Sequence, residues 1–115
     1  MGRWMEYSLE RGDQAVIVRV VGRVDESSWE AFSAALGEAI REAREAEIGD
    51  LVIDLAALDY MSSRGLRALT VAKRQADETE IRIWLASPNE VMREILAISR
   101  YDKLFTVTET VEVKR

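Results

Sequence analysis

Residues 51–55 constrain the fold of this chain more than any other segment. They read LVIDL, a nearly unbroken apolar run. Such a short run is typical of a central strand that is covered on both faces of its sheet. We therefore expect this segment to lie in the middle of a sheet against which helices are packed.

An amphipathic helix is predicted before this strand, from residue 28 to about residue 46. Apolar side chains recur there every three or four positions, and charged side chains fill the other positions. The apolar positions are Trp29, Phe32, Leu36, Ala39, Ile40 and Ala43. Asp25, Ser27 and Ser28 stand where any of them can accept a hydrogen bond from the free amides of the first turn. Gly49 marks the exit of the helix.

The remaining segments also alternate between strand and helix patterns. We expect an opening hairpin of strands 5–9 and 14–21, a loop at 56–62, a helix at 63–78 and a strand at 81–86. A third helix at 88–98 takes Ser87 as its N-cap and buries Val91, Met92, Ile95 and Leu96. Residues 100–103 read as a solvated turn and residues 104–108 as a last strand, while the charged tail 109–115 has no assignment. The pattern predicts one α/β domain, residues 1–115, with helices on at least one face of the sheet.

The composition excludes much of enzymology. The chain has no cysteine and no histidine, so it lacks the thiol nucleophile, the commonest general base and the commonest zinc ligands. We therefore expect a binding module that is not an enzyme and that needs no cofactor or metal. Its net charge of −5 argues against nucleic acid as a partner.

The sequence also predicts the compartment. No apolar run approaches the roughly 20 residues that a membrane span needs. Residues 1–6 do not resemble a secretory signal. We expect no membrane association and a cytoplasmic protein.

The segment most informative about function is DLAALDYMSSRGLRAL, from Asp54 to Leu69. Here a buried strand is followed by a polar loop, and Ser62 and Ser63 then open a helix. The free amides at a helix start favour negative charge, so the fold can tolerate a phosphate on Ser63. Arg64 and Arg67 are close enough in sequence to pair with that phosphate. The plainer alternative is that both serines only cap the helix.

Two further interpretations concern carboxylates and tryptophans. Asp25, Asp54 and Asp59 could form an Mg²⁺ site like that of a response-regulator receiver, but the acidic pair expected after the first strand is absent. Asp54 is more simply a strand-end carboxylate that accepts loop amides. We expect Trp29 and Trp84 in the core, and an exposed side chain only at Trp4.

The serine-containing segment resembles the STAS domains of bacterial anti-sigma-factor antagonists. In that family a strand ending in Asp-Leu is followed by an aromatic residue, an aliphatic residue, a serine pair and Gly-Leu. The segment VVGRVDESSWEAF looks like the family's Gly-x-x-Asp element, and residues 98–113 are also similar. The resemblance implies a STAS fold, a mixed sheet of about five strands with helices packed mainly on one face.

The resemblance also implies a function and its residues. Ser63, two residues before Gly65, matches the serine that the family phosphorylates, with Ser62 as the alternative. Ser62 and Arg64 stand where the best-known members have an aspartate and a small residue. Asp25 matches an acidic residue that faces the kinase. The partner-binding set is therefore expected to be Asp25, Ser62, Ser63, Arg64, Gly65 and Arg67.

The implied partners are an anti-sigma factor that is also a GHKL-type serine kinase, and a serine phosphatase. The unphosphorylated chain would bind the kinase, and phosphorylation would end the complex. The alternative is a STAS scaffold or transporter-associated subunit that is not phosphorylated.

Overall fold

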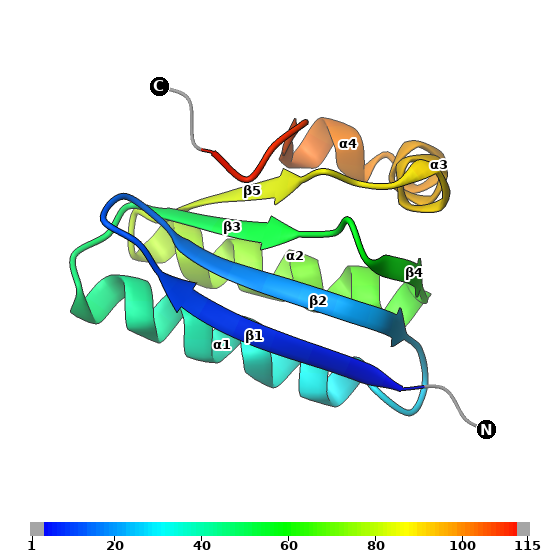
Figure 1. Cartoon of the computed structure of the whole chain (residues 1–115), viewed down its shortest axis with the longest axis horizontal. Coiled ribbons are helices and arrows are strands. Elements are labelled where there is room, and N and C mark those ends of the chain that lie inside the picture. Colours follow the sequence, from blue (N-terminus) through cyan, green and yellow to red (C-terminus); the bar gives the residue numbers. More distant parts are fainter. Residues whose placement is uncertain (1–3, 113–115) are drawn as a thin grey trace.

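The structure of the chain, a computed structural model, describes residues 4–112 (Figure 1). After an opening hairpin, strands and helices follow one another as the sequence predicts, except for one additional strand and one additional short helix. The elements are β1 (Met5–Arg11), β2 (Val16–Val24), α1 (Trp29–Glu45), β3 (Asp50–Asp54), β4 (Leu58–Met61), α2 (Ser63–Glu78), β5 (Arg82–Ala86), α3 (Glu90–Ser99), α4 (Tyr101–Leu104) and β6 (Thr106–Thr108).

The strands form one mixed sheet. Its order is β1-β2-β3-β5-β6, and β4 pairs with β2 outside this path. β1 runs antiparallel to β2, and the other pairs are parallel. The α/β fold is confirmed, and β3, which begins and ends one residue before the predicted strand 51–55, lies in the middle of the sheet as predicted.

β4 is a strand where the sequence predicts only a loop, at residues 56–62. β2 is longer than its neighbour β3, which pairs with it only from Val16 to Arg19. The chain after β3 returns to β2 and pairs with Gly22, Arg23 and Val24. Gly22 has a φ of +104°, and a Cβ there would collide with the carbonyl oxygen of Trp4, so this position requires glycine.

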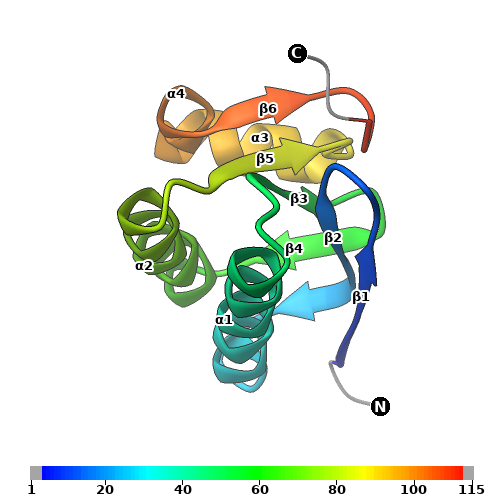
Figure 2. The same cartoon turned by 90° about the vertical axis from the view of Figure 1, so that its left-hand side faces the viewer.

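Helices α1 and α2 cover one face of the sheet side by side (Figure 2). The inward residues of β2 alternate with half-buried ones, as a strand with one helix-covered face requires. The predicted apolar stripe of α1 is buried apart from Trp29, which is partly buried. The prediction of helices mainly on one face is confirmed.

A second, smaller cluster lies on the opposite face of the sheet. It contains Ala15, Val52, Trp84 and Ala86. The indole Nε1 of Trp84 donates a hydrogen bond to Oδ1 of the buried Asp50 at 2.8 Å. Trp84 is thus buried as predicted, and Trp4 is 53% exposed, also as predicted.

The start of the third helix differs from the prediction. Asn89, not Ser87, is the N-cap of α3, and its Oδ1 accepts a hydrogen bond from the amide of Met92. Ser87 instead has a φ of +54° and donates its hydroxyl to the carbonyl oxygen of Glu109. Met92 and Leu96 are buried as predicted, but Ile95 is only partly buried and Val91, at the start of the helix, is 50% exposed.

Residues 101–104 form helix α4 rather than a solvated turn, so β6 begins two residues later than predicted. Arg100 adopts a left-handed conformation, which separates α3 from α4. The hydroxyls of Tyr101 and Thr70 are 2.7 Å apart, and this contact joins α4 to α2. In the unassigned tail, Val111 packs on the smaller cluster, and residues 113–115 lie outside the described part of the chain.

Candidate functional site

The carboxyl ends of β2 and β4 lie side by side, and each leads into a helix. Arg23 pairs with Tyr60 and Val24 with Met61. Just beyond these pairs, the amide of Ser62 donates a hydrogen bond to the carbonyl oxygen of Val24 at 2.8 Å. This pairing brings the Asp25 loop and the serine pair to the same edge of the sheet.

Ser62 is the N-cap of α2. Its side-chain oxygen accepts a hydrogen bond from the amide of Gly65 at 3.3 Å, and the residue is only 8% exposed. The hydroxyl is thus used within the fold and is shielded from solvent. Ser62 therefore caps α2, the role that the plainer alternative assigned to both serines.

Ser63 is the first residue of α2 and is exposed. Within residues 4–112, its hydroxyl has no hydrogen-bond partner. It stands among the free amides of the first helical turn, where the helix dipole favours negative charge. Ser63 is thus both accessible to an enzyme and placed where an added anion is tolerated.

Gly65 is buried beneath this turn. A Cβ at this position would lie 2.5 Å from Cγ of Met61 and 2.7 Å from Cγ1 of Val24. Only glycine lets α2 approach the ends of β2 and β4 this closely. Gly65, predicted as part of the partner-binding set, thus lies in the packing beneath the surface.

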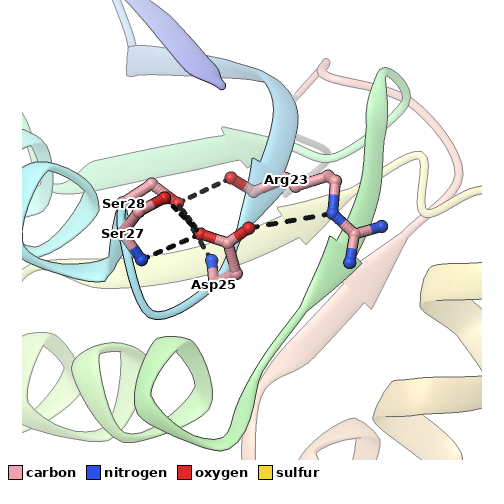
Figure 3. Close-up of polar contacts among 4 residues, drawn as sticks. All are labelled: Arg23, Asp25, Ser27 and Ser28. Carbon is pink, nitrogen blue, oxygen red and sulfur yellow. Dashed lines mark hydrogen bonds and ion pairs between the residues drawn. The ribbon is translucent and has the colours of Figure 1, made fainter. Parts of the chain in front are cut away.

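Asp25 organises the turn between β2 and α1 (Figure 3). Its Oδ1 accepts hydrogen bonds from the amide and hydroxyl of Ser27, at 3.0 and 2.8 Å, and from the hydroxyl of Ser28 at 3.2 Å. The Ser27 hydrogen bonds, assisted by Ser28 and by the charge of Arg23, lower the pKa of the Asp25 carboxyl. Asp25 therefore holds a negative charge beside the start of α2.

The Asp25 network does not cap α1 in the way the sequence predicts. The amides of Ser28 and Trp29 bond to the backbone carbonyl of Asp25, not to a side chain. Ser28 is the N-cap residue but makes no side-chain capping bond, because its hydroxyl oxygen already accepts a hydrogen bond from the amide of Asp25 at 2.9 Å while the hydroxyl donates to the carbonyl oxygen of Arg23. Asp25, Ser27 and Ser28, the three predicted capping residues, instead stabilise the turn through hydrogen bonds with one another.

Arg23 and Tyr60 complete this edge, and the sequence analysis missed both. The Arg23 guanidinium lies over the Tyr60 ring, 4.5 Å from its centroid, and its Nε is 3.8 Å from Oδ2 of Asp25. Figure 3 shows the Arg23 side chain beside Asp25, with its Nε facing the carboxylate. Arg23 and Tyr60 are neighbours only because β2 pairs with β4. Since the sequence analysis did not predict β4, it could not recognise this contact.

Arg64 and Arg67 lie in the first turns of α2. Nε of Arg64 is 3.4 Å from Oε1 of Glu26, and its guanidinium lies over the Trp29 ring, 5.4 Å from the centroid. Arg67 is exposed and forms no ion pair within the described part of the chain. Both cations are thus at the same end of the molecule as Ser63.

The carboxylates considered for Mg²⁺ do not gather. Asp54 accepts a hydrogen bond from the amide of Ala56 at 3.0 Å and pairs with Arg19 at 3.4 Å, which is the strand-end role expected of it. Asp59 is exposed on β4. Across residues 4–112, no group of three or more acidic side chains is placed to hold a metal ion. None of the helices in the same range has the length and apolar character needed to cross a membrane.

The sequence of residues 6–113 matches the family described as the STAS domain. The chain belongs to the STAS domain family. This membership confirms the resemblance seen in the sequence and the prediction of a binding module rather than an enzyme. It also excludes the receiver interpretation of Asp54.

Three relatives illustrate the similarity of this STAS domain to known proteins. It is 26% identical over 108 residues to BtrV of Bordetella bronchiseptica, whose name assigns it provisionally to the anti-sigma factor antagonists, with 94% of this chain and 90% of BtrV covered. An anti-sigma factor antagonist from Mycobacterium paratuberculosis has a TM-score of 0.81 and 22% identity over 94% of this chain and 88% of its own.

The third relative is the antagonist SpoIIAA, solved in two forms. The unphosphorylated form has a TM-score of 0.72 and 19% identity, covering 90% of this chain and 89% of its own. The phosphorylated form, from Bacillus, has a TM-score of 0.64 and 20% identity, covering 90% and 92%. At these identities the solved structures establish the shared fold.

Proposed function

We propose that this STAS domain is a cytoplasmic anti-sigma factor antagonist controlled by phosphorylation of Ser63. In its unphosphorylated form it binds an anti-sigma factor that is also a GHKL-type serine kinase. That kinase phosphorylates Ser63 and thereby ends the complex, and a serine phosphatase restores the binding form. The contact surface is the edge that carries Asp25, Ser62, Ser63, Arg64 and Arg67, with Gly65 beneath it.

The observation that carries the proposal is the contrast between the two serines. Ser63 is exposed with a free hydroxyl, whereas Ser62 is buried and bonded to the amide of Gly65. A kinase can reach the Ser63 hydroxyl without disturbing the fold. Modification of Ser62 would instead require the loss of the α2 cap.

The electrostatics of the edge supply a reason for the switch. A phosphate on Ser63 adds a charge of about −1.5 to −2 at neutral pH. The α2 amides and the two nearby arginines let the isolated domain carry this charge. In a complex, however, the phosphate would have to be desolvated against the partner beside the ionised Asp25, which opposes association.

The relatives support the same assignment. BtrV and the Mycobacterium paratuberculosis protein are both described as anti-sigma factor antagonists. SpoIIAA, another such antagonist, exists in phosphorylated and unphosphorylated forms. The motif around Ser63 and the similar fold make the same kind of control reasonable for this chain.

The test is phosphorylation by GHKL-type kinases from the source organism, with ATP and the purified chain. We expect one phosphate, mapped to Ser63 by fragmentation mass spectrometry and absent from Ser63→Ala. A phosphate on Ser62, or undiminished modification of Ser63→Ala, would contradict the assignment. If none of the kinases that bind the chain modifies it, the non-phosphorylated scaffold becomes the better description.

A further inference from the structure

A groove runs between α1 and α2 at the end of the molecule that carries Ser63. It has a volume of about 390 Å³ and is lined by Trp29, Ser33, Arg64, Arg67, Ala68 and Val71. We call it the α1–α2 groove. Its α2 residues follow spacings of three and four, so they form one continuous helical stripe.

The groove combines apolar surface with positive charge. Val71 is 38% exposed although it is a large apolar residue, and Trp29 is only partly buried. Two of the six lining residues are arginines and none is acidic. The whole chain carries a net charge of −5, so this is a local reversal of sign. Both helices also begin at this end, and their dipoles add to the positive potential.

One carboxylate of the chain already contacts the rim of the groove. Glu26, whose side chain is 74% exposed, is 3.4 Å from Arg64. An ion pair between two exposed side chains contributes little to stability, so a carboxylate from another protein can replace Glu26 at low cost. Arg67 has no ion pair to lose among the described residues. The groove thus offers two cations for incoming carboxylates.

We propose that the α1–α2 groove docks an acidic amphipathic helix of the partner protein. Carboxylates one helical turn apart reach Arg64 and Arg67, and an apolar side chain of the same helix packs on Trp29 and Val71. This inference rests on the proposed function, because it adds a second contact to the surface around Ser63. A phosphate on Ser63 would compete for the same two arginines, so phosphorylation would also weaken this contact.

The probe is a blocked helical peptide of about 15 residues made of Leu, Ala and Glu, a length at which an isolated helix becomes stable. Its matched control has Gln in place of each Glu. Titrations of the ¹⁵N-labelled full chain are followed by NMR, with the Trp29 indole signal assigned through Trp29→Phe. We expect saturable shifts at Trp29, Ser33 and Val71, a Kd below about 1 mM, and at least about ten-fold weaker binding of the Gln peptide.

Variants of α2 test the location. The double variant Arg64→Glu/Arg67→Glu should bind the Glu peptide at least about ten-fold more weakly, while Arg74→Glu, on the same helix outside the groove, should bind within about two-fold of the wild type. If the double variant does not fold, Arg64→Gln/Arg67→Gln takes its place. No binding, shifts outside the groove, equal binding of the Gln peptide, or equal effects of the Arg74 and double variants would each overturn the proposal.

These outcomes are separate from those of the phosphorylation test, because the peptide titrations involve neither a kinase nor a change at Ser63. If Ser63 is phosphorylated but the peptide does not bind, the docking proposal is wrong and the proposed phosphorylation switch is retained. If the peptide binds but Ser63 is not phosphorylated, the groove remains a docking site, and the domain is better described as a scaffold.

Discussion

The amide of Ser62 donates a hydrogen bond to the carbonyl oxygen of Val24 at 2.8 Å, and this hydrogen bond joins the start of α2 to the end of β2. Since Asp25 follows Val24 and Ser63 follows Ser62, the bond fixes how the Asp25 turn and the exposed serine are placed relative to one another.

Removing the two serine hydroxyls should affect stability unequally. Ser62→Ala loses the cap of α2 and should lower the free energy of unfolding by about 0.5–2 kcal/mol. Ser63→Ala removes an exposed hydroxyl and should change it by no more than about 0.5 kcal/mol. Urea denaturation followed by circular dichroism measures both values, and an equal loss in the two variants would contradict the capping assignment.

Two glycine-to-alanine changes in helices should have opposite signs. Gly65→Ala forces a methyl group against Met61 and Val24 and should destabilise the fold by about 1–3 kcal/mol. Gly37→Ala in α1 meets no atom within 4 Å and should stabilise it by about 0.5–1 kcal/mol. Thermal and urea unfolding of both variants, side by side, would test this difference.

The lowered pKa of Asp25 predicts how its contribution to stability depends on pH. A carboxyl with a depressed native pKa stabilises the fold above its unfolded pKa, near 3.8, and this contribution is lost as the pH falls through the native value. The stability difference between wild type and Asp25→Asn should therefore be largest near neutral pH and shrink below about pH 4. NMR titration of the carboxyl carbon measures the native pKa, and a value at or above 3.8 would refute the prediction.

Charge at Ser63 should control association with the kinase that modifies it. Ser63→Ala should bind that kinase with unchanged affinity, whereas Ser63→Asp should bind it more weakly. The phosphorylated chain should have the lowest affinity, because the phosphate adds nearly two charges and the aspartate only one. Gln75→Glu adds the same charge at the far end of α2 and should bind normally. Calorimetric titration compares all three, and equal affinities of the Ser63 variants would favour the scaffold.

The long amphipathic elements could be predicted from the sequence because their periodicity is set by burial. The stripe of α1 is an example, and it lies where expected. β3 could also be predicted, but from an unbroken apolar run, which is typical of a strand covered on both faces. β4 was not recognisable, because four residues of mixed polarity carry no periodic signal. It forms only because β2 extends past β3, which is a tertiary effect.

In the candidate site, too, some features could be predicted from the sequence and others depend on tertiary packing. The motif drew attention to Ser62, Ser63 and Gly65, but their different environments follow from the packing of α2 against Met61 and Val24. The N-cap of α3 is a further case. Ser87 and Asn89 are both good capping residues, and the choice falls on Asn89 because its amide group also donates to the carbonyl oxygens of Ala56 and Leu58.

The pairing of β4 with β2 alone has a consequence for local opening. β3 is hydrogen-bonded on both sides, by β2 and β5, so its amides exchange with solvent only when the sheet itself opens. β4 is held by three residue pairs on one side and by the Asn89 side chain. The segment that presents Ser63 can therefore detach from the sheet at a lower free-energy cost than global unfolding, and deuterium should enter β4 before it enters β3.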